Sequence, residues 1–262
     1  MDRSLGRFRR IAGCGALLAA LAALVSGCPA PGYDPNWRSR SERVLVLPLN
    51  VVAAMPEELS DRATRRVDKI LLDYLAASGK SVSTIGFSDA VAAWRAGESD
   101  CRSAATKGCD RFERVAPFAA RHLRAGHDYD VLIVPYLLLR GARTNGYVAS
   151  FDGVERPVKT SGYPPNGPYG YGPYGYGPYA YGPYGFGGGR IRAVSLKVFG
   201  YSAEGKKVFA GIGGLDVVDR IEASEEPGAY TTEVRKNLLR DPDAIREGVA
   251  RAFSRLVPRP RS

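Results

Sequence analysis

Two nearly continuous apolar runs, at 44–49 and 130–139, are the strongest hydrophobic signals in the body of this chain. Runs without polar alternation are typical of strands that are covered on both faces of a sheet. Pro135 lies inside the second run, so it must occupy a position where the strand needs no backbone donor. A shorter strand is expected at 82–85.

Apolar residues recur every three or four positions after the first run, which predicts amphipathic helices. The first helix covers about 59–75 and ends at Gly79. Ser88 is expected to cap a second helix, which continues through Trp94 and stops at Gly97.

Two more helices are predicted on either side of the second apolar run. One covers 111–123 and contains Pro117, which either kinks the helix or marks its true start. The other begins at Asp241, a capping residue followed by proline at the first helical position, and has apolar residues at helical spacing over 245–256.

Antiparallel pairs complete the predicted fold. Residues 142–151 are expected to pair with the apolar run 130–139, and residues 190–202 to form a hairpin with 206–218. The sequence therefore predicts one mixed α/β domain over 43–257, with a sheet of about five to six strands flanked by helices.

A low-complexity insertion at 162–189 interrupts this domain with four units of Gly-Pro-Tyr-(Gly/Ala)-(Tyr/Phe). Proline removes backbone donors and glycine raises the cost of ordering, so a disordered loop is expected. The loop is either an interaction arm whose rings stack on sugars or proline-rich partners, or a tolerated expansion at a loop tip. The candidate interaction residues are Tyr169, Tyr171, Tyr174, Tyr176, Tyr179, Tyr181 and Tyr184.

The amino terminus has the pattern of a secretory signal peptide. Four arginines precede residue 11, and the apolar run that follows, 11–25, has about 15 residues. A helix needs roughly 20 residues to cross a membrane, so a permanent transmembrane helix is the weaker interpretation. We expect residues 1–27 to be a signal peptide.

The end of this segment, Val25-Ser26-Gly27-Cys28, resembles the lipobox of bacterial lipoproteins. That resemblance implies cleavage before Cys28, diacylglycerol on its thiol, and a fatty acid such as palmitate on its new amino group. The alternative is an ordinary signal peptide with a chance cysteine. Pro29 stands where an aspartate often signals retention in the inner membrane, so the resemblance implies the periplasmic side of the outer membrane.

Residues 28–42 are rich in proline, glycine and charge, and we interpret them as a lipidated tether, while 258–262 form a disordered tail. The formal net charge of +10 stays positive when the predicted signal is removed. This charge favours anionic neighbours such as acidic glycans, although a solvated basic surface explains it equally well. No nucleic-acid-binding motif is present, and no nucleic-acid partner is expected.

Two further cysteines, Cys101 and Cys109, are close in sequence. In an oxidising envelope compartment such a pair usually forms a disulfide. The alternatives are free thiols, or a metal site that includes His122 and His127. The spacing between the cysteines is longer than the two to four residues usual in zinc sites, so we expect a disulfide and no metal.

Catalytic signatures are missing from the sequence. It has no nucleophile elbow, no phosphate-binding loop and no His-Glu-x-x-His helix. We expect no enzymatic activity and no cofactor, and the alternative is a hydrolase with an unrecognised acidic site.

The order of predicted elements resembles a superfamily of envelope α/β domains that includes the TolB amino-terminal domain and the curli-secretion lipoprotein. The resemblance depends on Arg43-Val44-Leu45-Val46-Leu47-Pro48-Leu49 before a long helix, and on Tyr129-Asp130-Val131-Leu132-Ile133-Val134 after a helix. It implies a non-enzymatic module that binds or assembles export, secretion or cell-wall machinery. Envelope proteins or anionic glycans are the expected partners, homo-oligomers would fit the resemblance, and an envelope glycan-binding protein is the alternative function.

Overall fold

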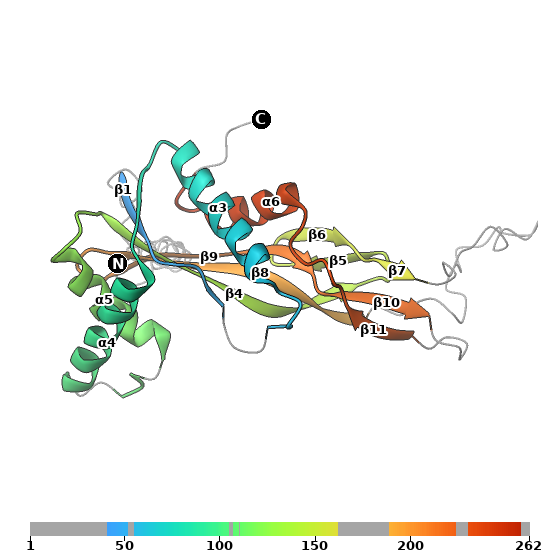
Figure 1. Cartoon of the computed structure of the whole chain (residues 1–262), viewed down its shortest axis with the longest axis horizontal. Helices are drawn as coiled ribbons and strands as arrows, with labels where there is room; N and C mark the ends of the chain where they lie inside the picture. Colours follow the sequence, from blue (N-terminus) through green and yellow to red (C-terminus); the bar gives the residue numbers. More distant parts are fainter. Residues whose placement is uncertain are drawn as a thin grey trace, which may run out of the picture. The chain divides into compact units, whose positions relative to one another are not determined.

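A computed structural model of the chain describes residues 41–51, 55–104, 107–109, 111–161, 189–223 and 230–257 (Figure 1). These residues belong to one compact unit. The predicted signal peptide, Cys28, the tyrosines of the repeat and the tail 258–262 lie outside the described residues. Within the described residues the fold is mixed α/β, with a main sheet of eight strands and a second sheet of three.

The main sheet is built around β1 (Arg43–Val46), which corresponds to the first apolar run. It pairs in parallel with β3 (Ser81–Thr84) on one side and with β4 (Val131–Thr144) on the other. After a short interruption, β2 (Asn50–Val51) pairs with β4 further along. All four apolar residues 44–47 are buried, as expected for a strand covered on both faces.

A long antiparallel hairpin widens this sheet. β8 (Gly189–Ser202) pairs with β4 along its full length, and β9 (Lys207–Val217) pairs with β8, as the hairpin pattern predicts. The expected pairing of 142–151 with the apolar run is wrong. β5 (Val148–Phe151) meets β4 only at Arg143 and Thr144, because β8 covers one edge of β4 and β1 and β2 occupy most of the other.

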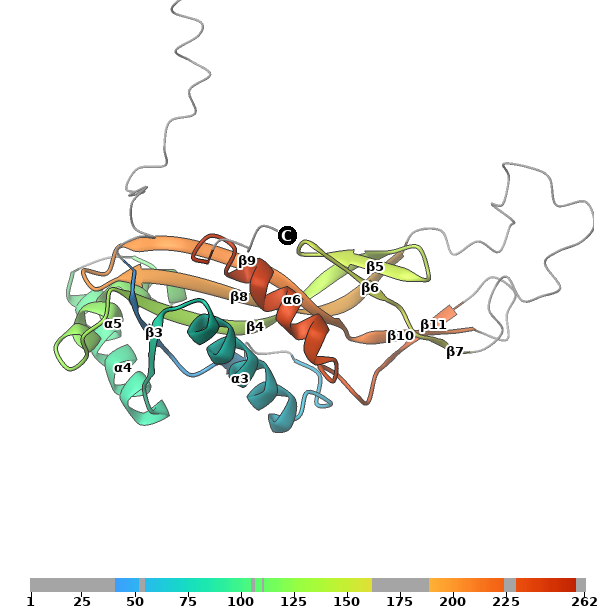
Figure 2. The same ribbon diagram turned by 90° about the horizontal axis from the view of Figure 1, so that it is seen from above.

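Two helices cover one face of the sheet, drawn above it in Figure 1. α3 (Asp61–Ala77) begins at Ser60, whose hydroxyl accepts a hydrogen bond from the Ala63 amide. α6 (Pro242–Ala252) begins at Asp241, whose carboxylate accepts from two amides of the first turn. The Asp241 cap is the one that the sequence predicts. The expected cap of the second predicted helix at Ser88 is wrong, because that helix begins earlier, at Phe87 after Gly86, and has no side-chain cap. Figure 2 shows α6 crossing β8 and β9.

The opposite face carries α4 (Phe87–Ser103) and α5 (Phe112–Arg124). Successive residues of β1 and β4 point to opposite faces, so the strands supply a separate core to each helix pair. Val44, Val131 and Ile133 pack with α3 and α6, whereas Leu45 and Leu132 pack with α4 and α5.

The predicted end of the second helix at Gly97 is wrong, because α4 continues for six more residues to Ser103. Gly97 lies inside the helix where α5 crosses it most closely. A Cβ atom at this position would lie 2.8 Å from the backbone nitrogen of Ala119. The glycine therefore permits close helix packing and does not end the helix.

Both internal prolines fit their elements. Pro117 lies within α5, so it kinks or bends the helix at most and does not start it. Pro135 lies between the segments of β4 that pair with β1 and with β2. Its missing donor costs little there, because residues 47–49 leave the sheet beside it.

Several short strands lie near the end of β4 and the start of β8. The periodicity of the sequence did not predict them. β6 (Val154–Pro157) forms a hairpin with β5, and Phe151 and Val154 pack against Gly214. β7 (Thr160–Ser161), β10 (Asp219–Ala223) and β11 (Tyr230–Val234) form the second sheet. A third, smaller core lies here.

Candidate functional site

The candidate site lies where β1 ends and the direction of the chain across the sheet changes. From β1 the chain passes over one face to the edge strand β3, and then returns over the other face to β4. In open α/β sheets, ligands bind outside the carboxyl ends of the strands at such a change of order. A ligand site is therefore expected beside the segment that follows β1.

A groove of about 490 Å³ lies at this point, between the segment that follows β1 and the outer side of α4. Most of its surface is apolar, and only three of its side chains are polar. Its lining residues are Leu47, Pro48, Leu49, Asn50, Phe87, Ala90, Val91, Trp94, Arg95, Glu98, Phe112 and Val134. We call this feature the β1–α4 groove.

Two stacked rings form one wall of the β1–α4 groove. Trp94 from α4 and Phe112 from the first turn of α5 have ring centroids 4.9 Å apart and planes inclined by 24°. Both side chains are half-buried. The close packing of α4 on α5 helps to bring the two rings together, because Gly97, one turn after Trp94, lies against the backbone of α5 at Ala119.

Phe87, the first residue of α4, stands at the mouth of the groove with 75% of its surface exposed. An exposed ring that continues an apolar groove is typical of a surface that another molecule covers, because the covering molecule removes the apolar patch from water. Neighbouring Ala90 and Val91 extend this apolar surface along α4 into the groove.

The charged rim of the groove consists of Arg95 and Glu98. The Glu98 carboxylate lies 3.6 Å from Arg102 one turn further along α4. Arg95 is exposed and forms no ion pair with the residues that the structure describes. Its guanidinium is therefore available to a partner.

The aromatic wall continues past the groove across β4 and β8. Phe112 contacts Tyr136 and Phe199, with ring centroids 5.8 Å and 5.7 Å away. Two ammonium groups lie over the Phe199 ring, Lys197 at 4.9 Å and Lys207 at 4.6 Å from its centroid. We call these two residues the lysine pair.

Two tyrosines lie deeper in the same core. Burial raises the pKa of Tyr129 to about 12, and its hydroxyl donates a hydrogen bond to the carbonyl of Ala120. Burial likewise raises the pKa of Tyr201, whose ring is next to Phe199. Both phenols therefore stay neutral at physiological pH, and their rings pack in the core beneath α4 and α5.

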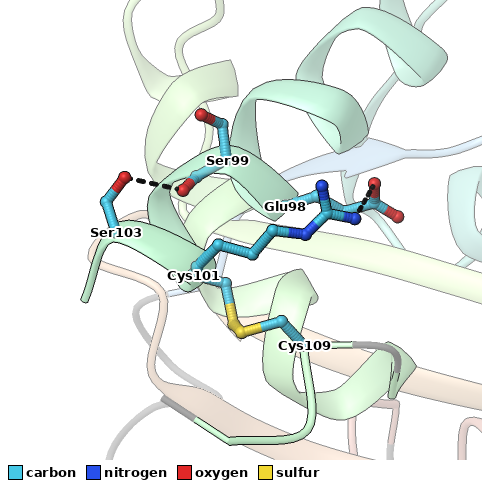
Figure 3. The surroundings of a disulfide bond; sticks show 6 residues. Glu98, Ser99, Cys101, Ser103 and Cys109 are labelled. Atoms are coloured by element: carbon cyan, nitrogen blue, oxygen red, sulfur yellow. Dashed lines mark hydrogen bonds and ion pairs between the residues drawn. A yellow bond between two sulfur atoms is a disulfide. The ribbon is translucent and has the colours of Figure 1, made fainter. Parts of the chain in front are cut away.

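The candidate cysteines are joined by a disulfide, with Cα atoms 5.8 Å apart (Figure 3). Cys101 lies in the last turns of α4 and is buried, and Cys109 lies in the segment that leads to α5. His122 hydrogen-bonds to Asp100 at 2.8 Å. Within the described ranges, no group of three or more His, Cys, Asp or Glu side chains is arranged to hold a metal ion.

The sequence did not identify the β1–α4 groove. The sequence indicates a helical position for Trp94 and places Phe112 in a predicted helix, but the stacking of the two rings depends on a crossing of two helices. A Phe at position 87, beside the predicted cap Ser88, was the one local signal, since an apolar residue at a helix start often packs against the helix. In the structure it does not pack there.

Among solved structures, this chain has a distant similarity to a known protein. No protein-family model matches the sequence, and no curated protein matches it. A crystal structure described as a homolog of the neuraminyllactose-binding hemagglutinin from Helicobacter pylori aligns with a TM-score of 0.32 and 10% identity, over 79% of this chain and 81% of that chain. The resemblance to TolB-like domains stays a prediction, and no helix among the described residues is long and apolar enough to span a membrane.

Proposed function

We propose that this chain is a non-enzymatic lipoprotein of the bacterial outer membrane, which binds an apolar segment of a partner protein in the β1–α4 groove. Lipid on Cys28 would hold the body at the membrane, with residues 29–42 as a tether on the periplasmic side. The observation that carries the proposal is the exposed Phe87 ring at the mouth of an apolar groove.

The composition of the groove favours a protein partner. Aromatic residues and arginine are enriched in the regions that dominate binding energy at protein interfaces. Here Phe87, Trp94 and Arg95 are grouped on one side of α4. An apolar side chain that covers Phe87 would gain about 25 cal/mol for each Å² of apolar surface removed from water.

A glycan ligand fits the groove less well. Sugars stack on the open faces of aromatic rings and need several convergent polar groups for orientation. Trp94 and Phe112 use one face of each ring to stack on one another. Asn50, Arg95 and Glu98 are the only polar side chains in the lining, and Glu98 already lies near Arg102.

The disulfide is consistent with the proposed location in the periplasm. Disulfides persist in the oxidising periplasm and are rare in the cytosol. The bond joins Cys101 of α4 to Cys109 in the segment that leads to α5, so export to an oxidising compartment would favour the arrangement of the helices that form the groove wall.

In-cell photocrosslinking tests the proposal directly. A photoreactive phenylalanine analogue replaces Phe87, and a matched variant carries it at Lys69, which is 75% exposed on α3 across the sheet. We expect one envelope protein to be captured from position 87 and not from position 69. Mass spectrometry should place the crosslink in an apolar segment of that protein.

The competing outcomes are distinct. Equal capture from both positions would show that the groove has no special role. Capture of glycan alone from position 87 would replace the protein-binding proposal with the glycan-binding one. Binding of the captured protein should also weaken in Phe87→Ser, a variant that leaves the core intact because the ring is exposed.

A further inference from the structure

We infer that the segment bound in the β1–α4 groove is acidic, and that the lysine pair binds its carboxylates. This inference rests on the proposed function and adds the charge of the partner. The juxtaposition that carries it is two ammonium groups on one ring, next to an apolar groove.

The lysine pair concentrates positive charge. Lys197 comes from β8 and Lys207 from the start of β9, yet both lie over Phe199. Their ammonium groups therefore cannot be further apart than the sum of their two distances to that ring. Like charges at such separations repel each other, and a bound anion relieves the repulsion.

The negative charge that faces this pair is small. Glu113 lies 3.8 Å from Lys207, and its side chain is 58% exposed. Lys197 forms no ion pair with any residue that the structure describes, and it also lies 5.9 Å from the Tyr136 ring. The aromatic rings hold both lysines in place through cation–π contacts, so less side-chain freedom is lost when a carboxylate binds.

The lysine pair and the groove are connected through ring contacts of Phe112. Phe112 lines the groove and contacts Tyr136 and Phe199, the two rings beneath Lys197. Asn50, another lining residue, is the register partner of Tyr136. An extended segment of a few residues would place apolar side chains in the groove and a carboxylate at the lysine pair, since each residue spans about 3.3 Å.

Carboxylates fit this site better than phosphate does. Phosphate sites typically combine an arginine fork or a helix amino terminus with convergent backbone donors. The lysine pair instead presents two separate point charges on adjacent strands. Such charges suit single carboxylates spaced along a peptide.

Selection from a random peptide library displayed on phage tests the inference. The bait is the protein purified in detergent from the envelope of its host. We expect enriched peptides that combine apolar residues with Asp or Glu. A representative peptide should bind the Lys197→Gln/Lys207→Gln variant about tenfold more weakly, with a smaller dependence on salt.

A matched control variant, Lys69→Gln/Lys236→Gln, loses the same charge at exposed positions away from the groove and should bind normally. Enrichment of apolar peptides without acidic residues would overturn the inference and leave the proposed groove intact. Failure to enrich any peptide whose binding depends on Phe87 would count against the proposed function itself.

Binding to lipid vesicles tests whether the lysine pair binds anionic lipid headgroups and not peptide carboxylates. Sedimentation with phosphatidylglycerol vesicles should be the same for the wild type and the Lys197→Gln/Lys207→Gln variant. If the variant lost vesicle binding but bound the acidic peptide normally, the lysine pair would be a lipid-binding site and the inference would be wrong.

Discussion

Asp130 shows how one side chain fixes the start of the sheet. Its carboxylate accepts hydrogen bonds from the backbone amides of Glu42 and Arg43 and from the Arg43 guanidinium, at 2.7–3.0 Å. It therefore joins the residue before β4 to the first residues of β1. Burial alone would raise the pKa of Asp130, but these hydrogen bonds outweigh it and lower the pKa.

The pKa of Asp130 predicts an acid-dependent loss of stability. Because the folded pKa is lower than the unfolded one, the contribution is complete above the unfolded value of about 4 and is lost as pH falls through the folded value. Asp130→Asn should lower the free energy of unfolding at pH 7 and flatten its dependence on pH below about 4. Urea titrations between pH 2 and pH 7 measure this, and an unchanged slope for the variant would contradict the assignment.

Gly97 is a second residue with a disproportionate effect. Gly97→Ala should destabilise the protein by about 1–3 kcal/mol, because its Cβ would collide with the backbone of α5 and not with a movable side chain. Gly126→Ala is the matched control, since a Cβ at position 126 has no neighbour within 4 Å. Chemical denaturation should separate the two variants; equal stabilities would show that α5 moves away without cost.

At the scale of elements, helices with clear apolar stripes and side-chain caps were predictable. Asp241 marks the start of α6 in the sequence as it does in the structure. The Ser60 cap of α3 was not predicted, although the apolar stripe of that helix was. The prediction ended α4 too early, because a glycine considered without its neighbours indicates the end of a helix. The packing role of Gly97 becomes visible only when α5 lies against it. The short strands β10 and β11 were missed, since five-residue strands carry little hydrophobic pattern.

The binding surface was not predictable for a related reason. The rings of Trp94, Phe112, Tyr136 and Phe199 come from four different elements. In the sequence each is an ordinary apolar position of its own element. Only the pairing of β4 with β8 and the crossing of α4 with α5 bring them into one row.

The disulfide stabilises the arrangement of these elements. Cys101→Ala/Cys109→Ala should lower the free energy of unfolding by about 2–3 kcal/mol, because the short loop is no longer closed in the unfolded chain. Urea denaturation without reductant gives this difference. Dithiothreitol should shift the unfolding midpoint of the wild type toward that of the variant. A similar shift in the variant would show that dithiothreitol does not act through this disulfide.

At the scale of the whole molecule, the proposed lipid on Cys28 and the folded body are separable. Each acyl methylene in the bilayer contributes about 0.8 kcal/mol, so a multiply acylated cysteine holds firmly. Cys28→Ser should leave the body folded and release it into the soluble envelope fraction. Fractionation and circular dichroism measure both properties, and a variant that still sediments with membranes would contradict the anchor.

The position of β1 has a mechanical consequence for an anchored protein. The predicted tether joins the fold at Arg43, the first residue of a strand that lies between β3 and β4. A pull along the tether would load both parallel ladders of β1 in shear, so their hydrogen bonds would have to yield together and not one at a time. The Asp130 carboxylate, bonded to the first amides of that strand, would be the first contact to bear the force.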